Sequence, residues 1–74
     1  MNEKIMVAGA GKSGIAAVKL LLETGGSVFL YDSNTQLDAE ALRERFPQDA
    51  KLVIKLGELE YSDLSGIQIC VMSP

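Results

Sequence analysis

The chain has 74 residues, which allows one small domain of marginal stability, since a domain of this size buries only roughly 60% of the surface of its unfolded chain. With 47% hydrophobic and 23% charged residues it is globular in composition, and disordered, collagen-like and coiled-coil classes are excluded. The net charge is −3 and the seven basic residues are scattered, so the sequence predicts no nucleic-acid binding. The longest apolar run, residues 5–10, is too short for a membrane span, and we expect neither membrane attachment nor a signal peptide.

Histidine is absent and cysteine occurs once. The absence of histidine removes the usual general base and the commonest metal ligand. Cys70 cannot form a disulfide within the chain, which fits a reducing cytoplasm. Because it lies in an apolar run, we expect Cys70 to be a small core residue.

The first half of the chain changes its hydrophobic period at a glycine-rich segment. Residues 4–8 are almost continuously apolar, which predicts a strand buried on both faces of a parallel sheet. Residues 13–24 have helical periodicity, and Gly25-Gly26 supplies a left-handed end for that helix. The apolar face of this predicted helix carries Ile15, Val18, Leu21 and Leu22.

A second strand and a second helix are predicted next. Residues 27–31 form an apolar run closed by Asp32, and a polar loop, residues 33–36, follows. Asp38 is the predicted N-cap of a helix that ends before Pro47. The apolar residues of this segment are Leu37 and Leu42, placed for a hydrophobic staple, and Phe46 one turn further on.

The remaining segments complete an alternation of strands and helices. Residues 52–54 predict a third strand stopped at Gly57, residues 58–64 are ambiguous and suit a single helical turn, and residues 67–72 predict a fourth strand. This alternation predicts a parallel sheet with right-handed crossovers. The chain stops directly after the fourth strand, which predicts a truncated domain whose last strand is an open edge.

The segment from Gly9 to Gly14 carries the clearest chemistry. Gly9-x-Gly11-x-x-Gly14 follows a predicted strand and opens a predicted helix, as the dinucleotide fingerprint requires. Gly9 permits a tight turn, Gly11 lets a diphosphate approach the backbone, and Gly14 allows close packing of helix on strand. The helix N-terminus favours an anion, Lys12 adds a cation, and Ser13 can cap the helix or donate to a phosphate.

Several nucleotides and one structural alternative fit this turn. Asp32 lies 21 residues beyond Gly11, near the spacing of about 20 for an acidic residue that binds a ribose in NAD proteins. On these residues alone, NAD is therefore the default ligand. The structural alternative is a glycine-rich turn that serves only the close packing of helix on strand. A triphosphate-binding P-loop is excluded, because Met6 occupies the position of its first glycine.

Taken together, the motifs resemble those of one protein family. Residues 7–17, Tyr31-Asp32-Ser33, Gly57 and Val71-Met72-Ser73-Pro74 resemble the start of the UDP-N-acetylmuramoyl-L-alanine:D-glutamate ligases (MurD). The resemblance covers essentially all 74 residues and implies an N-terminal domain, residues 1–74, of a larger multidomain ligase. The implied fold is α/β, a three-layer Rossmann-like parallel sheet of strand order 3-2-1-4, truncated after the fourth strand.

The resemblance also implies a site for UDP instead of NAD. Lys12 and Ser13 would face the diphosphate, and Asp32, Ser33 and Asn34 would surround the uracil. A carboxylate can accept from the imide N–H of the base, and a backbone N–H can serve a carbonyl oxygen. The expected UDP-binding residues are Gly9, Gly11, Lys12, Ser13, Gly14, Asp32, Ser33, Asn34, Ser73 and Pro74.

The implied reaction belongs to a cytoplasmic enzyme of peptidoglycan synthesis. ATP phosphorylates the carboxylate of UDP-N-acetylmuramoyl-L-alanine, and the amine of D-glutamate attacks the acyl phosphate to form an amide. ATP, Mg²⁺ and D-glutamate are expected to bind domains beyond these residues, so we expect no catalytic residue, no cofactor, no metal, and weakened UDP binding in this chain. The open edge of the fourth strand also offers a route to self-association.

Overall fold

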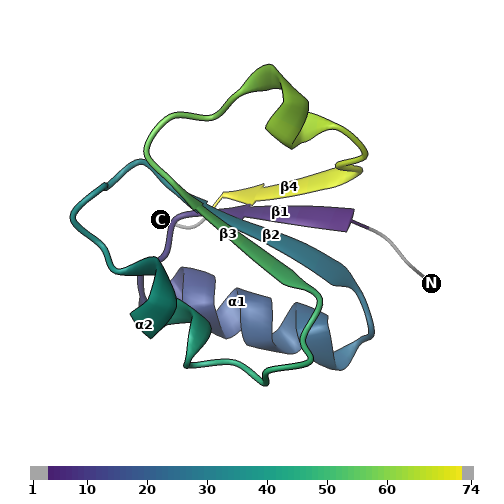
Figure 1. Ribbon diagram of the computed structural model, residues 1–74. Coiled ribbons are helices and arrows are strands. Elements are labelled where there is room, and N and C mark those ends of the chain that lie inside the picture. The colour runs from purple at the N-terminus through teal and green to yellow at the C-terminus, as the bar shows by residue number, and fades with distance from the viewer. Residues whose placement is uncertain (1–3, 73–74) are drawn as a thin grey trace.

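The computed structural model describes residues 4–72 and contains one parallel sheet (Figure 1). Its four strands have the order β3-β2-β1-β4, so the predicted strand order is confirmed. In register, Val7 of β1 lies between Leu30 of β2 and Val71 of β4, and Leu30 lies beside Ile54 of β3. The strands and helices are β1 Lys4–Ala8, α1 Lys12–Glu23, β2 Ser27–Asp32, α2 Ala39–Arg43, β3 Leu52–Leu56, the 3-10 turn η1 Tyr61–Leu64, and β4 Ile69–Met72.

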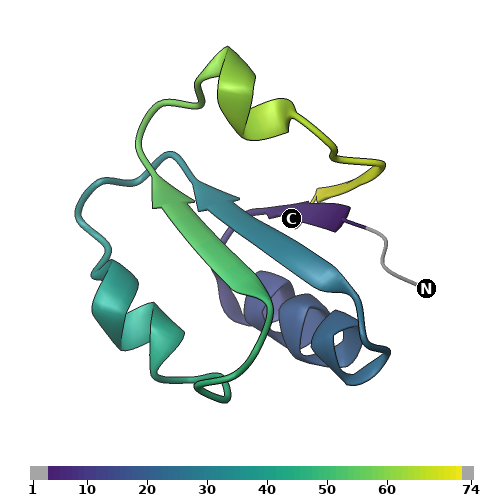
Figure 2. The same cartoon turned by 45° about the vertical axis from the view of Figure 1, so that its right-hand side comes forward.

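Both α-helices lie on one face of the sheet, and η1 passes over the other (Figure 2). The core forms between the helices and the side chains of β1 and β2 that point toward them, and Val7, Val18 and Leu30 are fully buried. Ile15, Leu21 and Leu22 pack against this core, which confirms the predicted apolar face of α1. The arrangement is a small Rossmann-like α/β fold.

The end of α1 shows why two glycines follow it. The N–H of Gly26 donates to the oxygen of Leu21 at 3.4 Å, and the N–H of Gly25 donates to that of Leu22 at 3.1 Å. This pair of hydrogen bonds is a Schellman motif. Gly25 has φ +85°, a conformation that costs little only for glycine, so the predicted helix stop is confirmed.

Helix α2 is shorter than predicted. It ends at Arg43, three residues before Phe46, and residues 44–46 continue as a turn. Phe46 is nevertheless buried in the core. The Arg43 guanidinium donates to the backbone oxygens of Gln48 and Ala50, at 3.0 and 3.1 Å, and so ties the loop before β3 back to the helix.

The predicted N-cap of α2 is confirmed. Oδ1 of Asp38 accepts hydrogen bonds from the N–H groups of Glu40 at 3.0 Å and Ala41 at 3.3 Å. These two donors have no partner within the helix, so the carboxylate stabilises its first turn.

We expect Asp38→Ala to lower the free energy of unfolding by about 1 kcal/mol, because those two N–H groups lose their acceptor. Urea unfolding followed by circular dichroism measures the change. Asp49→Ala, at an exposed carboxylate in the loop before β3, is the control and should change stability by less than about 0.5 kcal/mol. Equal losses for both variants would contradict the assigned cap.

Strand β4 corrects two predictions. It begins at Ile69, two residues later than expected, and Cys70 is exposed and is not a core residue. The physical reason is that, within residues 4–72, β4 pairs only with β1 at the edge of the sheet, so Ile69, Cys70 and Met72 stay accessible while Val71 packs against the core. Met72 is 76% exposed. None of the helices formed by these residues is long and apolar enough to cross a bilayer.

Candidate functional site

The glycine-rich turn connects β1 to α1 at the carboxyl ends of the strands, on the left of Figure 1. Gly9 has φ +111°, so the chain reverses in a conformation that favours glycine. Its N–H donates to the oxygen of Tyr31 at 2.7 Å. The first helical hydrogen bond runs from the N–H of Ile15 to the oxygen of Gly11 at 2.9 Å. Gly14 is buried, in keeping with close packing of α1 on the sheet.

The start of α1 presents unused hydrogen-bond donors. Gly11 is the N-cap, and no side chain caps the helix. Within the described part of the chain, the N–H groups of Lys12, Ser13 and Gly14 have no acceptor. Lys12 and Ser13 are exposed, and the helix dipole adds partial positive charge at this end. The turn is therefore able to bind an anion. Ser13, expected as a possible cap, lies instead at the second position of the helix.

Gly11 has no structural need to be glycine. Its φ is −77°, which any residue adopts, and a Cβ built there meets no atom within 4 Å. The space beside Gly11 is open, directly in front of the unused donors. Because Gly11 has no side chain, a group from outside the chain has room to come close to the backbone here.

Asp32 ends β2 beside this turn. Its Oδ2 accepts from the N–H of Ala10 at 2.8 Å, and its Oδ1 accepts from the N–H of Asn34 at 2.9 Å. The hydrogen bond from Ala10, and after it that from Asn34, holds the pKa of the Asp32 carboxyl below its ordinary value. Both oxygens are already engaged with the protein, and each retains one lone pair for a ligand.

The loop after β2 has turn chemistry of its own. Oδ1 of Asn34 accepts from the N–H of Gln36 at 2.9 Å, which leaves the side-chain amide of Asn34 as a donor. Ser33 and Asn34 are both exposed. The structure therefore brings the turn, Asp32, Ser33 and Asn34 to one edge of the sheet. The predicted site residues Ser73 and Pro74 lie outside the described residues.

Sequence reasoning gave no role to Tyr31 or to the contacts of Gly57. The Tyr31 hydroxyl donates to the oxygen of Gly57, whose N–H donates to the backbone oxygen of Asp32 at 2.9 Å. Gly57 has φ +98°, and a Cβ there would lie 3.2 Å from Cγ2 of Thr35. These contacts join the end of β3 to the loop after β2. A glycine that closes a strand was the only signal for them.

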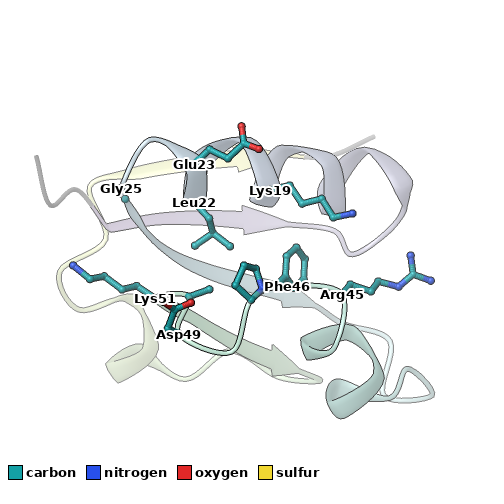
Figure 3. A pocket seen from close by; sticks show the side chains of 11 residues that line it. Lys19, Leu22, Glu23, Gly25, Arg45, Phe46, Asp49 and Lys51 are labelled. Carbon is teal, nitrogen blue, oxygen red and sulfur yellow. The ribbon is translucent and has the colours of Figure 1, made fainter.

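A cavity of about 500 Å³ lies elsewhere, between α1 and the loop before β3 (Figure 3). Leu22 points into it from α1, and its rim carries charges of both signs. Its residues include Gly25 and Lys51, which precede β2 and β3, so it lies at the opposite end of the sheet from the glycine turn. The negative end of the α1 dipole faces that region and disfavours a phosphate. We therefore place the candidate nucleotide site at the turn.

The described residues form no recognisable metal-binding site. Across residues 4–72, no three His, Cys, Asp or Glu side chains gather where they could hold an ion. The turn offers backbone N–H groups and a lysine, which suit an anionic ligand.

Comparison with known proteins shows relatives that match nearly the whole chain. It is 39% identical over 74 residues to the UDP-N-acetylmuramoylalanine–D-glutamate ligase of Lachnoclostridium phytofermentans, 41% over 73 residues to that of Lachnospira eligens, and 38% over 74 residues to that of Caldanaerobacter subterraneus. The matches cover 99–100% of this chain. The chain matches the N-terminal region of the UDP-N-acetylmuramoylalanine–D-glutamate ligases.

The resemblance seen in the motifs is thereby confirmed. The chain corresponds to the N-terminal region of these ligases and spans 16% of the length of each of the three. No protein-family model matches it, and no solved structure matches it significantly.

Proposed function

We propose that residues 1–74 form the domain that holds the UDP part of UDP-N-acetylmuramoyl-L-alanine in this ligase. The single observation that carries the proposal is the open space beside Gly11, in front of three N–H groups at the start of α1 that have no acceptor among residues 4–72. The names of the relatives, which are ligases for a UDP-linked substrate, support the choice of UDP over other anions.

The diphosphate fits the turn. Its oxygens would accept from the N–H groups of Lys12, Ser13 and Gly14, and the absent side chain of Gly11 lets them come close. Hydrogen bonds to a charged acceptor are stronger than neutral ones. The exposed Lys12 ammonium and Ser13 hydroxyl would add donors from α1.

The uracil fits the loop after β2. Asp32 has a free lone pair on each oxygen for the imide N–H, while Ser33 and the Asn34 amide offer donors for the carbonyl oxygens. Ser73 and Pro74, which follow β4 in the sequence, stay part of the proposal on the motif resemblance alone.

The chemical step belongs to other parts of the protein. Met6 stands where a P-loop needs glycine, and residues 4–72 hold no cluster of metal ligands, so the described residues do not fit ATP or Mg²⁺. The matched relatives are about six times longer than this chain, which leaves room for those sites. We infer that this domain binds and positions the substrate in the cytoplasm and that D-glutamate and ATP bind elsewhere.

An NAD-binding module is the second candidate, favoured by the acidic residue at the end of β2. In NAD proteins that carboxylate accepts from the ribose hydroxyls. Here each Asp32 oxygen accepts one backbone N–H and retains one lone pair, which suits a ribose diol as well as an imide N–H, so the preference for UDP rests on the names of the relatives.

Nuclear magnetic resonance titration of the ¹⁵N-labelled chain tests the two candidates. We expect UDP to shift the amide signals of Gly11, Lys12 and Ser13, because these groups line the proposed diphosphate site. NADH, added at the same concentrations, should produce smaller shifts. Preference for NADH over UDP would overturn the proposal, and shifts confined to the cavity near Leu22 would place the site elsewhere.

A further inference from the structure

The contact between Asp32 and Ala10 joins two segments that the chain separates by 22 residues. Ala10 is buried and lies between the tight turn at Gly9 and the N-cap at Gly11. Besides this contact, the turn is tied to β2 by the bond from the Gly9 N–H to the Tyr31 oxygen. The Asp32 contact, at 2.8 Å, has a charged acceptor and acts directly on residue 10, so it is the stronger restraint there.

We infer that Asp32 is a positioning residue, whose carboxylate fixes the glycine-rich turn so that the N–H groups at the start of α1 face the diphosphate. The inference rests on the proposed nucleotide site. It assigns Asp32 a task apart from contact with the base, performed before any ligand arrives. Through Asn34 the same carboxylate also orients the loop after β2, so one side chain aligns both halves of the site.

Two other roles for Asp32 make different predictions. If it only contacts uracil, its removal should not affect a ligand that has no base. If it is only a nearby negative charge, its removal should tighten binding of any anion. Removal of a positioning residue has a different effect. It should weaken the binding even of inorganic pyrophosphate, which is a diphosphate without a nucleoside.

The first test uses the unliganded wild-type chain. The Ala10 amide signal should titrate with the Asp32 carboxyl, with a midpoint below the ordinary pKa of an aspartate, since accepting two N–H bonds favours the charged form. On the elements beside Asp32, α1 begins with Lys12, and β3 carries Lys55, which lies opposite Tyr31 and is paired with Glu60 and Asp63 at 3.4 and 3.5 Å. Loss of the titration in Asp32→Ala assigns it to Asp32.

The second test measures binding of inorganic pyrophosphate by amide shifts. Asp32→Ala should weaken it roughly two- to tenfold, and the amide of Ala10 should exchange with solvent faster by a similar factor. Asp32→Asn keeps one accepting oxygen, so its affinity for pyrophosphate should lie between those of the alanine variant and the wild type. Asp38→Ala is the matched control, because it removes an equal charge and an equal backbone acceptor from α2 without touching the turn.

The outcomes separate this inference from the proposed function. Pyrophosphate binding that is unchanged or tighter in Asp32→Ala overturns the positioning role, even when UDP binds to the wild type. An Ala10 amide that does not titrate in the folded wild type also overturns it, whether or not the variants fold. Conversely, a titrating Ala10 amide in a chain that binds no UDP supports the positioning role and refutes the UDP site.

Discussion

Replacing Gly11 with alanine should weaken UDP binding by at least roughly tenfold and leave the fold almost unchanged. The added methyl group would occupy the open space beside the turn and hold the diphosphate away from the N–H groups of α1. Losing even one hydrogen bond to a charged acceptor costs about 1.5–3 kcal/mol, which corresponds to about 10- to 100-fold in affinity. Isothermal titration with UDP measures the binding, and urea unfolding measures the stability.

Gly25→Ala is the matched control for this variant. A Cβ at Gly25 also meets no atom within 4 Å, but its φ is +85° where that of Gly11 is −77°. We expect Gly25→Ala to lower stability by about 1 kcal/mol and to leave UDP affinity unchanged, because it lies at the far end of α1. If Gly11→Ala binds UDP as tightly as wild type, the diphosphate does not lie at the turn.

Leu30→Ala should lower the free energy of unfolding by about 2–5 kcal/mol. Leu30 is fully buried at the centre of the sheet, between Val7 and Ile54, and its truncation leaves a cavity that the strands cannot close. A domain of this length has a total stability of only about 4–11 kcal/mol, so the loss is a large share of it. Urea unfolding followed by circular dichroism measures the total stability of the wild type and the loss of stability in the variant.

Leu20→Ala provides the comparison on α1. Leu20 is 63% exposed, and the same chemical change there should alter stability by less than about 0.5 kcal/mol. Similar losses for the two variants would mean that the core does not lie between α1 and β2 as described.

Local signals in the sequence predicted most of the fold. The glycines after α1, the cap at Asp38 and the apolar runs of β1 and β2 act over a few residues, and the structure confirms each of them. The errors occurred where packing overrides local preference. The length of α2 was overestimated because Phe46 reaches the core from a turn as well as it would from a helix.

Cys70 shows more clearly that tertiary packing overrides local preference. Its apolar neighbours predicted burial, but burial depends on what covers a strand, and within residues 4–72 β4 lies at the edge of the sheet, where Cys70 stays exposed. An apolar side chain favours burial, but whether it is buried depends on which elements pack over it in the folded protein. The predicted route of self-association through this edge stays a prediction.

By itself, the sequence determined the order of strands and helices, the glycine-rich turn between β1 and α1, and the match to the N-terminal region of the ligases, since these depend on patterns that adjacent residues carry. Only the tertiary structure decided how the candidate site is held together. The bond from Ala10 to Asp32 and the link from Tyr31 to Gly57 join segments more than twenty residues apart. Such contacts exist only after parallel strands align their carboxyl ends, and no local pattern encodes them.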